Sequence, residues 1–65
     1  MKVLINRQPY ELDESATLDD AIAMIQAKPP YAAAGNTQFV PRTQYRQHGL
    51  RDGDQIEIIS PVTGG

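Results

Sequence analysis

One segment of the chain has helical periodicity, and every other apolar run is short and typical of a strand. From Leu18 to Ile25, apolar residues recur at intervals of three and four, which places them on one face of a helix. Thr17 is a suitable N-cap before this segment, and Pro29-Pro30 is expected to close it. The sequence therefore predicts a single amphipathic helix from Thr17 to Lys28.

The remaining runs predict strands, because they are β-branched or alternate at period two. A hairpin is expected at the start, with asparagine and proline supplying a turn over residues 6–9. A helical turn ending at Gly49 is expected within Thr43–Leu50, and a tight turn at Asp52-Gly53-Asp54. The predicted strands are Lys2–Asn6, Tyr10–Leu12, a short strand within Tyr31–Asn36, Gln38–Val40 and Gln55–Ser60.

The last strand has the clearest division between two faces. Ile56 and Ile58 point one way, while Glu57 and Ile59 point the other. If the first pair packs on the helix, Ile59 is exposed on the open face of the sheet. These elements predict an α+β fold, a β-grasp, in which a mixed sheet of four to five strands packs on one helix. We expect one domain over residues 1–60 and a flexible tail over residues 61–65.

Composition argues against several classes of function. The net charge is −2 and the six basic residues are dispersed, so neither nucleic acid nor a membrane is an expected partner. The apolar runs are far shorter than the roughly 20 residues of a membrane span. The N-terminal residues lack the apolar region of a secretory signal, so no such signal is expected. Cysteine is absent, which excludes a thiol nucleophile and thiolate metal ligands. We expect a cytoplasmic protein that is monomeric when free.

The C-terminal part resembles a known family. Val40-Pro41-Arg42, an aromatic residue at Tyr45, the Asp52-Gly53-Asp54 turn, an aliphatic strand and a final Gly64-Gly65 follow one another in order. This pattern is similar to the ThiS family of thiamine-biosynthesis sulfur carriers, which are ubiquitin-like. Tyr45 stands where that family often has tryptophan, and Pro61 interrupts a tail that is often aliphatic.

The resemblance implies a protein cosubstrate rather than an enzyme. The carboxyl group of Gly65 is then adenylated by a ThiF-type, E1-like adenylyltransferase, and a sulfur nucleophile converts it to a thiocarboxylate for a ThiG-type thiazole synthase. Gly64 gives the tail backbone freedom. ATP and any metal belong to the activating partner, and no cofactor is expected on this chain. Partner contacts are predicted at Phe39, Ile59, Val62 and Thr63.

Three alternatives stay open. A carrier for molybdopterin or for a sulfur-containing amino acid shares the same tail, and a β-grasp binding module acts through its sheet face alone. A small enzyme built on His48, the only histidine, is disfavoured because no nucleophile adjoins it.

The clustered charges also have simple interpretations. The Asp52-Gly53-Asp54 turn lacks the other ligands of a calcium loop. The acidic residues favour a helix start and a solvated face, or docking to a basic surface. They are Glu11, Asp13, Glu14, Asp19 and Asp20, and a looser basic group comprises Arg42, Arg46 and Arg51.

Overall fold

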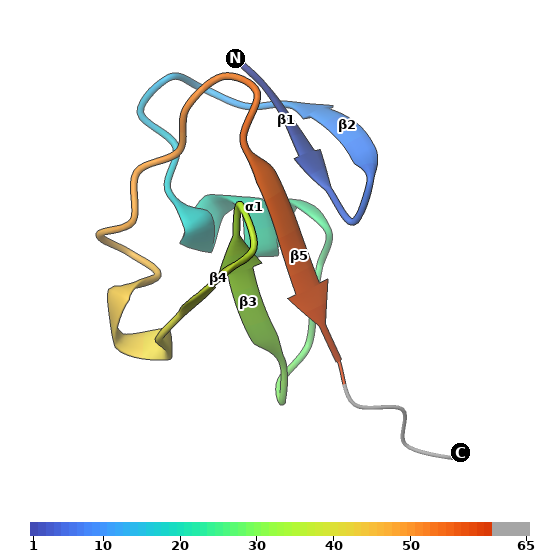
Figure 1. Cartoon of the computed structure of the whole chain (residues 1–65), viewed down its shortest axis with the longest axis vertical. Helices are drawn as coiled ribbons and strands as arrows, with labels where there is room; N and C mark the ends of the chain where they lie inside the picture. The colour runs from blue at the N-terminus through green and yellow to red at the C-terminus, as the bar shows by residue number, and fades with distance from the viewer. Residues whose placement is uncertain (61–65) are drawn as a thin grey trace.

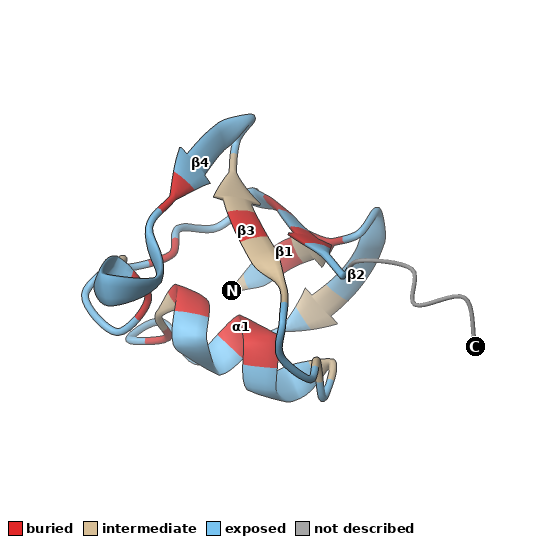
Figure 2. Cartoon of the chain, turned by 90° about the horizontal axis from the view of Figure 1, so that it is seen from below, coloured by how far each residue is buried: buried red, intermediate tan, exposed pale blue. Residues whose placement is uncertain are grey.

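The computed structural model describes residues 1–60, which form a five-stranded mixed sheet with one α-helix on its inner face (Figures 1 and 2). The strand order is β2-β1-β5-β3-β4, with β1 parallel to β5 and the other neighbours antiparallel. The predicted β-grasp is confirmed. Its elements are β1 Lys2–Ile5, β2 Gln8–Glu11, α1 Leu18–Met24, β3 Ala32–Gly35, β4 Gln38–Val40, the 3-10 helix η1 Arg42–Gln44, and β5 Gln55–Ile59.

The turn of the first hairpin is two residues shorter than predicted. Asn6 and Arg7 alone form the turn, with φ of 51° and 70°, the left-handed backbone that a two-residue hairpin turn requires. Gln8 and Pro9, predicted as turn residues, are therefore the first residues of β2, and Pro9 lies opposite Leu4. Proline is accommodated because β2 is an edge strand, where one row of backbone groups faces solvent.

The helix begins as predicted but ends four residues before Lys28. Asp20 Oδ2 accepts a hydrogen bond from the Thr17 N–H at 2.8 Å, which is half of a capping box. At the other end Gln26 has φ of 57°, and the N–H of Ala27 donates to the carbonyl of Ile22 at 3.3 Å. This is the bond pattern of a Schellman motif. The helix is therefore ended by a chain reversal, before the prolines are reached.

The segment after β4 also differs from the prediction. η1 starts directly after Pro41, and it is not ended by Gly49. It carries Tyr45 into the core, where this residue is 5% exposed and its ring stacks on Tyr31 with centroids 6.0 Å apart. The carbonyl of Tyr45 accepts a hydrogen bond from the Asp19 N–H at 3.1 Å, so this segment also caps the start of α1.

The core fills the space between α1 and the inner face of the sheet. Its largest fully buried side chains come from the two central strands and the first turn of the helix, namely Val3, Ile5, Leu18 and Ile56. Within residues 1–60, no polar or charged residue is buried. Tight apolar packing of this kind leaves the outer surface as the place for function.

Candidate functional site

The outer face of β5 carries the first predicted contact residue. Ile56 and Ile58 are 1% and 7% exposed, whereas Ile59 is 58% exposed. The predicted division of this strand is confirmed, because adjacent residues of a strand point to opposite faces. Ile59 is therefore held by the sheet without contributing to its core.

Strand register brings Phe39 to the same face. Phe39 lies opposite Ala34, and Ile59 lies opposite Ala32. Side chains of directly paired residues share a face of the sheet, and Ala32 and Ala34 are two positions apart, so all four residues lie on the outer face. Phe39 is 70% exposed. We call Ala32, Ala34, Phe39 and Ile59 the outer-face patch.

The outer-face patch has the character of a protein contact. Only three large apolar side chains are prominently exposed within residues 1–60, and Phe39 and Ile59 are two of them; the third, Met24, lies on α1. The two alanines between them have small side chains, so the middle of the patch is recessed relative to Phe39 and Ile59. A partner can therefore place its own side chains between Phe39 and Ile59, and exposed apolar clusters commonly serve this purpose.

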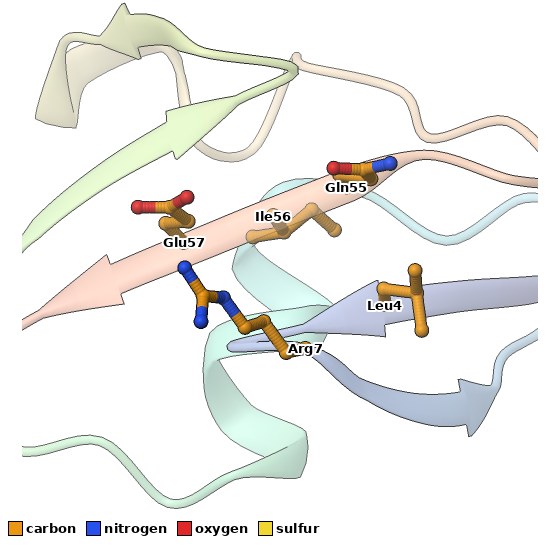
Figure 3. Close-up of a pocket in the computed structure, with 5 residues that line it drawn as sticks. All are labelled: Leu4, Arg7, Gln55, Ile56 and Glu57. Carbon is orange, nitrogen blue, oxygen red and sulfur yellow. The ribbon is translucent and has the colours of Figure 1, made fainter.

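A polar hollow adjoins the patch on the same sheet (Figure 3). Leu4, Gln55, Ile56 and Glu57 line it, together with Arg7 from the β1–β2 turn. Figure 3 shows the Arg7 side chain extending toward Glu57. The outer face thus combines an apolar half with a half that bears one charge of each sign. The sequence prediction missed Arg7, whose only signal was its place beside a turn asparagine.

The predicted tail residues lie outside the described part of the chain. These residues are Val62, Thr63, Gly64 and Gly65. The outer-face patch is nevertheless next to them in sequence, because Ser60, the last described residue, directly follows Ile59.

His48 contributes to the fold through its backbone carbonyl and its ring. Its carbonyl accepts a hydrogen bond from the N–H of Leu18, the first residue of α1, at 2.9 Å. Its ring packs over Gly35, where an added Cβ would lie 3.3 Å from His48 Nε2. Within residues 1–60, the adjacent hollow is also lined by Gln44 and Gln47, and neither side chain is a nucleophile.

Three of the carboxylates hold turns of the backbone in place. Asp52 Oδ1 accepts from the Lys2 N–H at 2.7 Å, and Asp54 Oδ2 accepts from the Arg51 N–H at 2.8 Å, so both stabilise the turn around Gly53. Asp13 accepts from the hydroxyl and the N–H of Ser15, and these bonds lower the pKa of its carboxyl below the usual 3.8. Within residues 1–60, no three His, Cys, Asp or Glu side chains are grouped as metal ligands.

Membrane insertion has no helical candidate in the described region. No helix within residues 1–60 has the length and apolar character needed to cross a bilayer.

The chain is similar in sequence and in fold to known proteins. The sequence model of the ThiS family matches residues 3–65. The chain is 35% identical to the sulfur carrier protein ThiS of Escherichia coli over 66 aligned positions that cover both proteins fully. The crystal structure of a ThiS protein from Geobacter metallireducens has the same fold, with a TM-score of 0.80, 20% identity and full coverage of both chains.

Two further relatives bear on the pathway. A thiazole synthase of Paramagnetospirillum magneticum is 29% identical over 66 aligned positions, which cover the whole of this chain and 20% of that protein. A molybdopterin synthase sulfur carrier subunit of Chlamydomonas reinhardtii is 35% identical, over 94% of this chain and 81% of that protein. The full-length match to the E. coli protein and the family match identify a sulfur carrier of thiamine biosynthesis rather than a catalyst. The chain belongs to the ThiS family.

Proposed function

We propose that this chain carries sulfur as a thiocarboxylate on the carboxyl group of Gly65. A carboxylate oxygen attacks the α-phosphorus of ATP in a ThiF-type adenylyltransferase and pyrophosphate leaves. A sulfur nucleophile then attacks the acyl carbon and displaces AMP. The thiocarboxylate finally donates its sulfur to a thiazole synthase. ATP and any metal act in the partner, so this chain needs no cofactor of its own.

The observation that carries this proposal is the position of the outer-face patch. Phe39 and Ile59 are exposed on the sheet, and the patch lies where β5 leads into residues 61–65. A partner that binds this patch is therefore next to the segment that bears Gly65. A fully extended segment of five residues spans at most about 17 Å, which is enough to reach a reaction centre away from the docking surface.

Glycine at both final positions suits this chemistry. A side chain on Gly65 would crowd the carbonyl carbon during attack, and one on Gly64 would restrict the backbone that aligns it. The absence of cysteine from the sequence also supports the carboxyl group of Gly65 as the site that carries sulfur, because a persulfide on this chain would require a thiol.

A thiazole synthase as acceptor is supported by the relative from P. magneticum, in which a thiazole synthase contains a stretch similar to this whole chain. We also propose that the free protein is a cytoplasmic monomer. The supply of ATP to its activating partner supports that location.

Intact mass spectrometry tests the proposal directly. The chain is incubated with ATP, its adenylyltransferase and a sulfur source, and a mass gain equal to the replacement of one oxygen by sulfur is expected at Gly65. A chain lacking Gly65 should still bind the adenylyltransferase and gain no sulfur. If the shortened chain keeps full function, the protein is a binding module instead. A His48→Ala chain should accept sulfur normally, whereas the small-enzyme alternative requires it to fail.

The similarity to a molybdopterin synthase subunit supports a second pathway as the competing function. Offering the purified thiocarboxylate to a thiazole synthase and to a molybdopterin synthase separates the two. We expect sulfur transfer to the thiazole synthase at least tenfold faster, a ratio that corresponds to about 1.4 kcal/mol in the barrier.

A further inference from the structure

The charges of this chain are segregated along the sequence. Residues 21–51 contain four of the six basic residues and none of the eight acidic ones. Asp52 and Asp54 bind backbone groups of Lys2 and Arg51, and so lie where β1 and β5 begin. The opposite end of β5 is about 13 Å away, at 3.3 Å per residue. At that end, where β5 finishes at Ile59, the neighbouring segments carry basic residues.

A hollow with a cationic wall lies at this opposite end. Pro29, Pro30, Tyr31 and Arg42 line it, and we call it the Arg42 hollow. Tyr31 directly precedes Ala32, which pairs with Ile59, the last residue of β5. The Arg42 hollow is therefore at the end of the sheet where the chain continues to Ser60 and residues 61–65. Lys28, immediately before Pro29, adds a second basic residue nearby in the chain.

The core fixes Arg42 in this place. The N–H of Tyr45 donates to the Arg42 carbonyl at 3.3 Å, and Tyr45 is buried against Tyr31. The wall of the hollow and its arginine are thus held by one aromatic stack. Ordering Arg42 on binding costs less when its backbone is already fixed.

Arg42 has no carboxylate partner in the described region. The single ion pair within residues 1–60 joins the N-terminal amine to Glu11 at 3.7 Å. An exposed arginine on a fixed backbone, beside proline and tyrosine surfaces, is suited to a carboxylate of another protein, which it can bind with two parallel hydrogen bonds.

We propose that Arg42 docks onto acidic side chains at the entrance of the channel in which the adenylyltransferase receives residues 61–65. This inference rests on the function proposed above. A protein that accepts Gly65 approaches the end of the sheet where residue 61 begins, and the Arg42 hollow lies at that same end. Gly65 lies up to about 17 Å further along the chain, so Arg42 acts at the entrance and not on the reacting phosphate.

Steady-state kinetics of ATP–pyrophosphate exchange, with the full-length chain as variable substrate, test the proposal. Arg42→Gln should raise the KM for the carrier about threefold to fivefold, as expected for one exposed ion pair, and leave kcat unchanged. Arg42→Lys keeps the charge but loses one of the two parallel hydrogen bonds, so its KM should lie between that of the unmodified chain and that of Arg42→Gln. Arg51→Gln is the matched control, because it removes the same charge at the other end of β5 and should change KM little.

Ionic strength provides the second readout. The ratio of KM values between Arg42→Gln and the unmodified chain should shrink as salt rises from about 0.01 to 0.15 M, because the screening length falls from about 30 to 8 Å. Equal effects of Arg42→Gln and Arg51→Gln would overturn the proposal, as would a loss of kcat at unchanged KM. Failure of the sulfur-carrier function itself has a different signature: the unmodified chain then supports no pyrophosphate exchange at any concentration.

Discussion

The side chain of Asn6 completes the hydrogen bonding of β5 where β1 ends. Asn6 Oδ1 accepts a hydrogen bond from the partly buried N–H of Ile58 at 2.9 Å, across 52 positions of sequence. The Asn6 N–H itself donates to the Ile56 carbonyl at 2.9 Å. One residue therefore supplies two successive bonds to the strand that leads to the proposed reactive segment.

Replacing Asn6 should destabilise the protein more than an ordinary surface change. Asn6→Ala leaves the Ile58 N–H without its acceptor and places alanine at φ 51°, so we expect a loss of about 2–3 kcal/mol in the free energy of unfolding. Asn6→Asp keeps an acceptor oxygen and should lose much less. Urea unfolding at neutral pH measures both, and equal losses would show that the side-chain bond contributes little.

Two glycines provide a matched test of backbone conformation. Gly53 has φ of +88°, Gly49 is not in the left-handed region, and an added Cβ would meet nothing within 4 Å at either position. Gly53→Ala should therefore lower the free energy of unfolding by about 1–2 kcal/mol through backbone strain alone. Gly49→Ala should be neutral or stabilising by up to about 1 kcal/mol, because alanine restricts the unfolded chain. Similar melting temperatures for the two variants would contradict the assigned turn geometry.

Phe39 should matter for binding and not for folding. It is 70% exposed, so Phe39→Ala removes little core packing, and its melting temperature should remain close to that of the unmodified chain. Affinity for the proposed adenylyltransferase partner, measured by calorimetry, should fall about tenfold if Phe39 is an anchor of the interface. Met24→Ala is the control, because Met24 is 47% exposed on α1 and lies outside the outer-face patch. Comparable losses of affinity in Phe39→Ala and Met24→Ala would show that the outer-face patch is not the docking surface.

The Asp13 carboxyl should titrate below its ordinary pKa of 3.8. The Ser15 hydroxyl and the Ser15 N–H both donate to it and favour the charged form. Because the pKa is lower in the folded state, the contribution of Asp13 to stability is present above pH 3.8 and is lost as pH falls through the folded pKa. Carbon-detected NMR titration measures this value, and Ser15→Ala should move it back toward 3.8. An unchanged value in that variant would assign the shift to another cause.

The sequence by itself determined the elements that depend on local pattern. The start of α1 directly after its N-cap Thr17 and the exposure of Ile59 follow from periodicity and capping, which act over a few residues. The aliphatic alternation of β5 likewise predicted which isoleucines enter the core. The family pattern around Val40-Pro41-Arg42 pointed to the sulfur carriers, and the full-length similarity agrees with it.

Only the tertiary structure decided where the elements end and which distant residues meet. Gln26 ends α1 in a left-handed conformation that glutamine does not favour by itself, and the aliphatic neighbours on either side gave no sign of it. Pro9 enters a strand because that strand is an edge. The contacts of Asn6 with Ile58 and of Arg42 with the hollow beside Tyr31 join segments far apart in sequence. Such pairs arise from packing of the whole sheet on its helix, a non-local free energy that no short window of sequence contains.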